Sequence, residues 1–211
     1  PKDSFYMMQQ ADILIQQGNN QKALDLLTQA LKIEPSNSRM WAKHGQMLRR
    51  LNRLDEALKS YTHAVDLDPK YGWAWNGRGL TLSAMNRHED ALKSFRAATD
   101  SGEQDAWYWY NLGDELVTLN RFTEALPVLE RALSLNPKHT ESWAKRGQAL
   151  RRLNRHAEAL TAYDEALAVN PHYAWAWNGR GLALENLGRR EEALASYERS
   201  ITEDPRVIWY Y

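Results

Sequence analysis

The sequence repeats itself every 34 residues, and this period limits the chain to a small set of folds. Five columns hold the period: tryptophan, glycine, leucine, alanine and proline. The tryptophan column is the easiest to follow in the printed sequence: Trp41, Trp75, Trp109, Trp143 and Trp177. Repeats of this length cannot bury their apolar face alone and must stack on one another. The period therefore predicts six stacked repeats rather than one closed core.

Each repeat contains two helical patterns. In the second repeat, Trp41, Gly45 and Leu48 fall on one helical stripe by their spacing of four and three. A second apolar pattern follows, with Asp55 as its expected N-cap and Pro69 as its end. Small residues such as Gly45 are expected where the two helices approach most closely. We therefore expect each repeat to be a helix–turn–helix.

These columns resemble the tetratricopeptide repeat family. The family's Trp, Leu-Gly, Ala and Pro positions are matched in the fourth repeat by Trp109, Leu112, Gly113, Ala125 and Pro137. The resemblance covers about residues 4–205 and implies an all-α fold, a right-handed α-solenoid of antiparallel helix–turn–helix repeats whose first helices line a concave groove. The expected repeats are 4–37, 38–71, 72–105, 106–139, 140–173 and 174–207, with the start of a seventh at 208–211.

A longer period of 102 residues lies on top of the 34-residue one. Residues 41–53 return almost unchanged as 143–155, and residues 71–80 return as 173–182. One position breaks the proline column, because Glu103 stands where the third repeat should have proline. The second and third repeats are therefore interpreted as a block duplicated in the fifth and sixth.

The last expected helix carries apolar residues that no later helix of the sequence covers. Leu194, Tyr197 and Ile201 share one face of it. Natural arrays of repeats end in a cap with a polar outer face, and no such cap is visible here. End-to-end self-association through the C-terminal repeat is therefore expected.

The composition argues against several classes of function. Lysine plus arginine and aspartate plus glutamate each number 27, so the formal net charge is zero, and there is no cysteine. Zero net charge argues against nucleic-acid binding, whose affinity comes mainly from neutralised phosphates. No apolar run approaches the ~20 residues needed to cross a bilayer, so no membrane-spanning helix is expected. A cytoplasmic location is favoured, and the start at Pro1 rather than methionine indicates a piece of a longer chain.

The sequence contains no pattern of catalytic or metal-ligating residues. None of the six histidines has the spacing of a zinc site, and no serine stands in a recognisable nucleophile elbow. The glycines of residues 76–79 lie inside an expected helix, which argues against a phosphate-binding loop. We therefore expect a protein that is not an enzyme and that needs no cofactor or metal.

Large aromatic residues outside the framework column are the first candidates for a binding site. Trp73, Trp107 and Trp175 lie on the stripe of the first helices that should face the groove, and Tyr110 lies one turn further. Tryptophan and tyrosine carry much of the energy of protein interfaces. The alternative is that each ring fills a gap against the preceding repeat.

Two arginine doublets on the same helices are the second candidates. Arg49 and Arg50 recur as Arg151 and Arg152, three repeats later. Guanidinium groups suit carboxylates, so each doublet is a candidate reader of acidic side chains. The alternative is that one arginine of each doublet is solvated or paired with an acid of the next repeat.

Polar residues on the groove stripe complete the candidate site. Asn76 and Asn178 offer both a donor and an acceptor, so each can hold the backbone of an extended peptide. Asp114 lies one turn beyond Tyr110 on the same stripe.

The sequence favours a protein-binding scaffold that holds an extended or helical segment of a partner in the groove. The partner is expected to carry acidic and apolar side chains. One alternative is an architectural spacer or oligomerisation module of a longer protein, and the accessibility of Trp73 and Trp175 discriminates between the two. Single-stranded nucleic acid, with tryptophans stacking on bases, ranks third.

Overall fold

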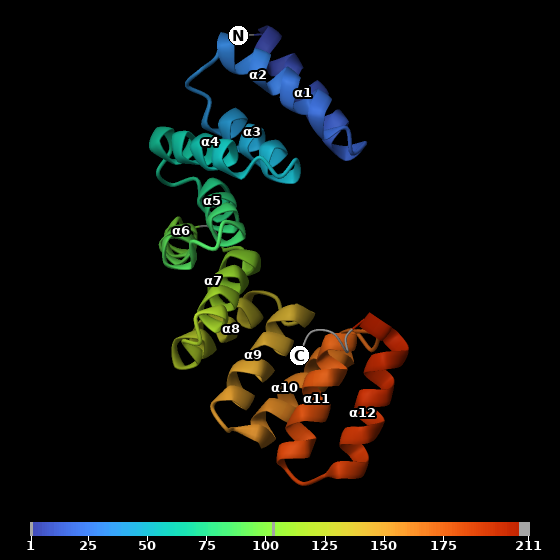
Figure 1. Cartoon of the computed structure of the whole chain (residues 1–211). Helices are drawn as coiled ribbons and strands as arrows, with labels where there is room; N and C mark the ends of the chain where they lie inside the picture. Colours follow the sequence, from blue (N-terminus) through green and yellow to red (C-terminus); the bar gives the residue numbers. More distant parts are fainter. Residues whose placement is uncertain (1, 103, 207–211) are drawn as a thin grey trace. The chain divides into compact units, whose positions relative to one another are not determined.

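The computed structural model describes residues 2–102 and 104–206, and these residues form α-helices joined by short turns, with no strand among them (Figure 1). The helices are α1 (Lys2–Gln16), α2 (Asn20–Ile33), α3 (Ser38–Arg50), α4 (Leu54–Leu67), α5 (Gly72–Ala84), α6 (His88–Asp100), α7 (Ala106–Thr118), α8 (Phe122–Leu135), α9 (Thr140–Arg152), α10 (His156–Val169), α11 (Ala174–Asn186) and α12 (Arg190–Glu203). The chain divides into two compact halves, Pro1–Glu103 and Gln104–Tyr211. Each half contains three helix pairs.

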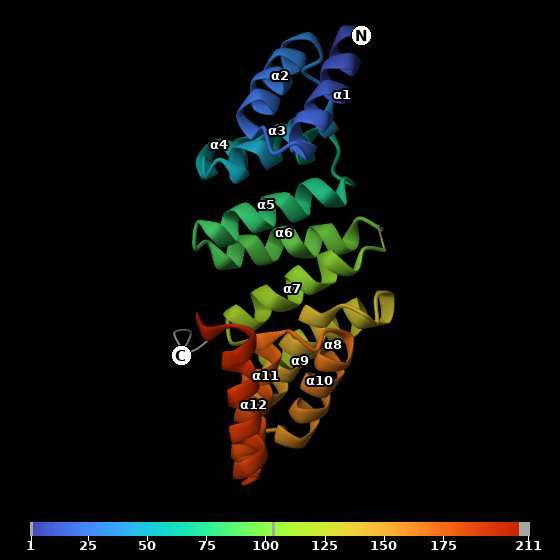
Figure 2. The same ribbon diagram turned by 90° about the vertical axis from the view of Figure 1, so that its right-hand side faces the viewer.

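Within each half the helix pairs stack in sequence order. In the N-terminal half, α1 pairs with α2, α3 with α4 and α5 with α6, while α2 packs on α3 and α4 packs on α5. The C-terminal half repeats this arrangement from α7 to α12 (Figure 2). First helices also touch one another directly, as α3 does α5 and as α9 does both α7 and α11. Each half is therefore a segment of an α-solenoid, and the expected helix–turn–helix repeats are confirmed.

The buried tyrosine of the second repeat explains why glycine recurs on the first helices. Tyr61 is 1% exposed, and its ring lies between α3 and α5. A Cβ added at Gly45 would lie 3.0 Å from this ring, and one added at Gly77 would lie 2.3 Å from it. Gly45 therefore lies at a close approach of two helices, as the sequence predicts.

The turn inside each repeat depends on one residue with positive φ. Asn52 has a φ of 59°, and the amide after it donates to the carbonyl of Leu48 at 2.9 Å, which closes the end of α3. Asparagine and glycine tolerate this conformation better than other residues. The same conformation recurs every 34 residues, at Gly18, Asn86, Asn120, Asn154 and Gly188.

The expected N-cap of the second helix is wrong. The helix α4 begins at Leu54, so Asp55 lies in its first turn and Arg53 occupies the N-cap position. No side chain caps this end; instead the guanidinium of Arg53 pairs with Glu56, with N–O distances of 2.6 and 2.7 Å. The carboxylates of the first turn favour the helix dipole without acting as caps.

The framework tryptophans are held by a repeated hydrogen bond. The indole of Trp143 donates from Nε1 to the carbonyl of Pro137 at 2.9 Å, and Trp41, Trp75 and Trp177 donate in the same way to Pro35, Pro69 and Pro171. Trp109 differs, because its buried Nε1 has no partner among the described residues. Trp109 belongs to the repeat that follows Glu103, the residue that stands in the sequence position of the proline.

The last described helix carries exposed apolar side chains. On α12, Leu194 is 60% exposed and Ile201 is 43% exposed. Tyr197 is half-buried, and its hydroxyl donates to Glu185 at 2.8 Å. The expected seventh repeat, 208–211, lies outside the described residues, and end-to-end association through α12 stays a prediction.

Candidate protein-binding face

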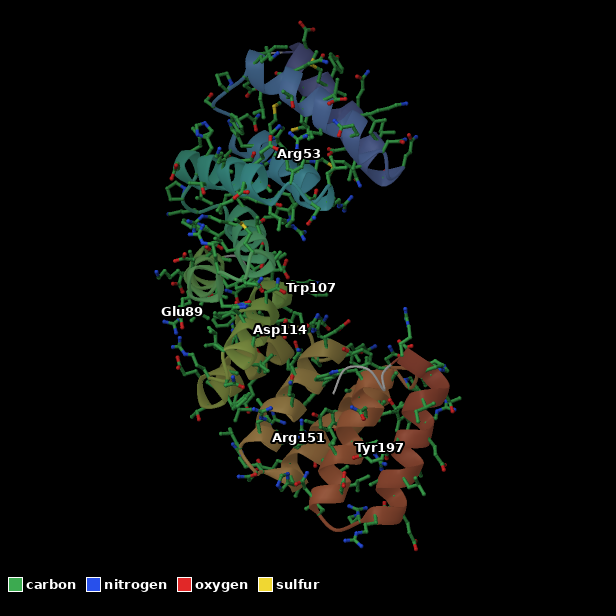
Figure 3. All side chains as sticks on the ribbon, in the orientation of Figure 1. Arg53, Glu89, Trp107, Asp114, Arg151 and Tyr197 are labelled. Atoms are coloured by element: carbon green, nitrogen blue, oxygen red, sulfur yellow. The ribbon has the colours of Figure 1, made fainter. Side chains whose placement is uncertain are left out.

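We call the first helices of each half the first-helix face: α1, α3 and α5 in the N-terminal half, and α7, α9 and α11 in the C-terminal half. In this face α3 packs beside α5, and α9 packs beside both α7 and α11, while an ion pair joins α1 to α3. All the residues that the sequence singles out lie on these helices: Arg49, Arg50, Trp73 and Asn76 in the N-terminal half, and Trp107, Tyr110, Asp114, Arg151, Arg152, Trp175 and Asn178 in the C-terminal half. Figure 3 labels Trp107 and Asp114 on α7 and Arg151 on α9.

Trp73 forms one wall of a surface cavity in the N-terminal half. The ring is half-buried, with its centroid 6.4 Å from that of Tyr61 and 6.0 Å from that of Tyr71. The cavity has a volume of about 440 Å³ and is lined by Asp12, Ile15, Gln16, Lys43, Gln46, Tyr71 and Trp73. Because Tyr61 and Tyr71 support the ring, Trp73 offers a fixed apolar surface to anything that enters.

An ion pair crosses this cavity between repeats. The ammonium of Lys43 on α3 pairs with the carboxylate of Asp12 on α1. Both side chains are partly exposed, so the pair adds little stability by itself. Its effect is to cancel the charge of Lys43 locally, whereas Arg49 and Arg50 on the same helix have no ion pair among the described residues.

The first arginine doublet is divided between an inner and an outer residue. Arg49 is half-buried, and its Nε has no hydrogen-bond partner, whereas Arg50 is exposed. Burial raises the pKa of Tyr61 to about 12, and the nearby charge of Arg49, which hydrogen-bonds the tyrosine hydroxyl, opposes this rise. Neither arginine forms an ion pair among the described residues.

Trp107 is the most exposed of the predicted aromatic anchors. Its side chain is 51% exposed and meets Tyr110 edge-on, with ring centroids 5.5 Å apart. Its ring also meets the edge of His139, at 4.6 Å. These two contacts fix the orientation of Trp107 and leave half of it accessible to a partner.

His139 is a site residue that the sequence did not reveal. It is 5% exposed, packs against Tyr110 at 4.9 Å, and caps α9 by accepting a hydrogen bond at Nδ1 from the amide of Ser142 at 3.2 Å. Burial lowers the pKa of His139, and the charges of Glu141 and Asp105 oppose this shift. The neutral ring is therefore the form that supports Trp107. Asn37, which lies 102 residues earlier, caps α3 in the same way.

Trp175 is supported as Trp73 is, with one further contact. Its centroid lies 6.3 Å from that of Tyr163 and 6.3 Å from that of Tyr173. Lys145 pairs with Asp114 at 2.7 Å, and its ammonium lies 5.1 Å from the centroid of the Trp175 ring. A cation at this distance is attracted to the face of the indole.

The same cluster changes the titration of two tyrosines. Burial, together with the charges of Glu141 and Asp114, raises the pKa of Tyr173 to about 12. The pKa of Tyr110 is raised as well, first by burial and then by Asp114. Both hydroxyls therefore remain neutral hydrogen-bonding groups near neutral pH.

The second arginine doublet is divided like the first. Arg151 is half-buried with an unpartnered Nε, whereas Arg152 is exposed. The guanidinium of Arg152 lies 5.2 Å from the ring centroid of Phe122 and donates to the Oδ1 of Asn120 at 3.4 Å. Arg152 is thus held by the preceding repeat, although without a carboxylate.

The two asparagines differ in their surroundings. Asn76 is 9% exposed, so only a small part of its side chain is accessible. Asn178 is half-buried, and its Nδ2 has no hydrogen-bond partner. An unpaired amide of this kind is a donor that a peptide carbonyl could occupy.

The sequence did not single out several site residues, because their importance depends on contacts between repeats: Asp12, Lys43, Tyr71, Lys145 and Tyr173. The lysines lie on α3 and α9, and the acids that they pair with lie one repeat earlier. The 102-residue period would have found them, since Asp12 and Lys43 recur as Asp114 and Lys145, and Tyr71 recurs as Tyr173.

Two further features of the described residues narrow the chemistry. No group of three or more histidine, aspartate or glutamate side chains among them could hold a metal ion. Within the same residues, no helix combines the length and the apolar character needed to cross a membrane.

Comparison with known families decides the classification. A family profile described as a tetratricopeptide repeat matches residues 8–72, 110–168 and 144–207. A second profile with the same description matches residues 60–93. The chain belongs to the tetratricopeptide repeat (TPR) family. Proteins of this family generally act as non-enzymatic scaffolds for protein interactions. No curated protein matches this TPR chain.

Solved structures with the same fold cover nearly the whole TPR chain. YrrB, described as a TPR protein with an unusual peptide-binding site, is 27% identical, with a TM-score of 0.72 over 85% of this chain and 92% of YrrB. PilF of Pseudomonas aeruginosa is 20% identical, with a TM-score of 0.82 over 97% of this chain and 93% of PilF. A MamA protein is 22% identical, with a TM-score of 0.72 over 82% of this chain and 94% of MamA. PilF and MamA, being less similar in sequence, support the fold alone.

Proposed function

We propose that this TPR chain binds an extended or helical segment of a partner protein on its first-helix face. Trp73, Trp107, Tyr110 and Trp175 are the apolar anchors. Asn178 holds the backbone of the segment, with a smaller part for Asn76, whose side chain is almost covered. The arginine doublets pair with its acidic side chains. Asp114 pairs with Lys145 and holds it beside Trp175.

The exposure of Trp107 is the observation that carries this proposal. An indole that is 51% exposed leaves a large apolar area in water. Covering such a ring with a partner contributes about 1–2 kcal/mol to binding, and more at the centre of an interface. Because Tyr110 and His139 already hold the ring, little side-chain entropy is lost when a partner covers it.

A similar structure supports the same reading. YrrB is described as having a peptide-binding site, and it aligns with 85% of this chain. The cavity beside Trp73 gives the N-terminal half a recess that a side chain of a partner could enter.

The spacer alternative predicts that the extra tryptophans are buried between repeats. Trp73 and Trp175 are half-buried, so one side of each ring packs within its half while the other stays accessible. Trp107 contacts His139, the N-cap of α9, but stays 51% exposed, and this exposure favours the binding function. Zero net charge continues to argue against single-stranded nucleic acid.

The proposal is tested by removing two anchors together. Peptides are first selected from a displayed random library against the chain, and their affinity is then measured for the variant Trp107→Ala with Trp175→Ala. We expect binding to weaken by at least tenfold, since each anchor contributes about 1–2 kcal/mol. Helicity should be unchanged by circular dichroism.

The matched control is Leu194→Ala, which removes a residue of similar exposure from a second helix. It should leave the affinity unchanged. If the double variant binds the peptides as tightly as the original chain, the first-helix face is not the binding surface.

A further inference from the structure

The 102-residue period places one set of six side chains in both halves, which we call the N-site and the C-site. The N-site consists of Asp12, Lys43, Gln46, Arg49, Tyr71 and Trp73, and the C-site consists of Asp114, Lys145, Gln148, Arg151, Tyr173 and Trp175. Each member of one site lies 102 residues from its counterpart. Each set lies wholly within one half of the chain.

The two sites are also matched in their contacts. In each, the lysine pairs with the aspartate of the preceding repeat. In each, the tryptophan lies against a tyrosine at the start of its own helix, at 6.0 Å in the N-site and 6.3 Å in the C-site. The Nε of the inner arginine is buried without a partner in both. The two halves therefore share these contacts and not only single residues, while the contact of Lys145 with the Trp175 ring is specific to the C-site.

The chemistry of one site defines the kind of segment that fits it. The tryptophan supplies a flat apolar wall, and the lysine beside it is neutralised by its aspartate. The arginines are not neutralised, since Arg49, Arg50, Arg151 and Arg152 form no ion pair among the described residues. A segment with an aromatic side chain next to carboxylates complements this arrangement.

The charge at one corner differs between the sites. Arg39 is the second residue of α3, and Glu141 is the second residue of α9, 102 positions later. The Oε2 of Glu141 lies 3.8 Å from the Nε2 of His139, and burial together with the charge of Glu141 raises the pKa of Tyr173, a member of the C-site. Arg39 is exposed and has no ion-pair partner among the described residues. By the 102-residue correspondence, the sequence position that carries a negative charge in the C-terminal half carries a positive charge in the N-terminal half.

We infer that the chain carries two matched sites for protein segments, one in each half, and that the N-site binds the more acidic segment. This inference rests on the proposed function and adds to it the number of sites and their difference in charge.

The test uses a synthetic acidic peptide as probe, acetyl-Glu-Asp-Phe-Asp-Glu-amide, in calorimetric titrations at low ionic strength. The original chain should bind two peptides. Trp175→Ala should abolish binding at the C-site, so that only the N-site binds the probe. Trp73→Ala should abolish binding at the N-site, so that only the C-site binds it. The remaining N-site should bind the probe about fivefold more tightly than the remaining C-site, a factor typical of partly exposed charges.

Exchange of the corner charges makes the test independent of the tryptophan variants. Arg39→Glu should weaken the N-site for the probe and Glu141→Arg should strengthen the C-site, each by a few-fold. Arg39 is exposed, and the side chain of Glu141 is 41% exposed with its Oε2 3.8 Å from the Nε2 of His139, so circular dichroism of each variant accompanies the titration. A peptide with lysine in place of each acid should show the opposite order of the two sites.

Two results would overturn the inference while leaving the proposed function intact. One is a single bound probe per chain. The other is two sites of equal affinity whose affinities do not change in Arg39→Glu and Glu141→Arg. If neither the probe nor any library-selected peptide binds the original chain, the proposed function fails together with it.

Discussion

The two halves of the chain share their packing but differ on the face that we propose to bind partners. An added Cβ at Gly77 or at Gly179 would lie 2.3 Å from a buried tyrosine ring in either half. At the matched corner of the first-helix face, in contrast, Arg39 in one half corresponds to Glu141 in the other. The contact between glycine and tyrosine leaves no room for a larger residue in either half, whereas the accessible position of Arg39 and Glu141 carries opposite charges. The comparison therefore separates the residues that specify the fold from those that can specify a partner.

The largest effect is expected from filling the close approach at the tyrosine. Gly77→Ala should destabilise the chain by about 1–3 kcal/mol, because the buried ring of Tyr61 cannot move away from the new methyl group. Gly179→Ala should have the same effect in the C-terminal half. Urea denaturation followed by circular dichroism measures both, and unequal losses would show that the halves are not packed alike.

Gly45→Ala is the matched control for this prediction. Its Cβ would lie 3.0 Å from the same ring, so a small shift suffices. Alanine also gains about 1 kcal/mol over glycine in a helix interior. The net change should therefore be close to zero, and a loss as large as that of Gly77→Ala would contradict the packing argument.

A smaller effect is expected at the framework tryptophans. Trp143→Phe removes the hydrogen bond from the indole to Pro137, whereas Trp109→Phe removes an indole that has no partner among the described residues. Both rings lie near an arginine, at 5.7 Å for Trp143 and 5.9 Å for Trp109, so the cation–π contact is similar. Trp143→Phe should cost about 1 kcal/mol more in unfolding free energy than Trp109→Phe. Equal costs would mean that the hydrogen bond adds no stability.

The smallest effect concerns pH and separates the two helix caps. Burial lowers the pKa of His139 in the folded chain, while Asn37 in the N-terminal half does not titrate. As the pH falls through about 6.5, His139 takes up a proton in the unfolded chain but not yet in the folded chain. The contribution of His139 to the free energy of unfolding is therefore complete above about pH 6.5 and is lost as the pH falls towards the lower pKa of the folded chain. His139→Asn should reduce the loss of stability between about pH 7 and pH 5.

Thermal unfolding of the original chain and of His139→Asn between about pH 5 and pH 7 measures the difference in their loss of stability. His44 also has a lowered pKa, but it is present in both proteins, so its contribution cancels. Identical pH profiles would contradict the assignment of His139 as a neutral cap.

The repeats and the fold could be predicted from the sequence because they depend on columns that recur five or six times. The turn conformation at Asn52 recurs just as regularly, but its backbone angle is not a property of residue type alone. The N-cap was misplaced because acidic residues suit the first turn of a helix as well as its cap, and Asp55 occupies the first turn.

The candidate site could be predicted only in part. The periodicity predicted Trp73, Trp107 and Trp175 on the first helices, because the face of a helix on which a residue lies follows from the spacing along that helix alone. How much of each ring is accessible depends on side chains from other helices, such as Tyr61 beside Trp73 and His139 beside Trp107. These contacts join residues that the spacing within one repeat does not relate.

The most direct test of the central claim follows the indole N–H groups by nitrogen-15 NMR while a library-selected peptide is added. The account predicts shifts for Trp73, Trp107 and Trp175 on the first-helix face. It predicts little change for Trp41, Trp75, Trp143 and Trp177, whose N–H groups remain bonded to proline carbonyls. Shifts confined to the bonded indoles, with the other three unmoved, would contradict it.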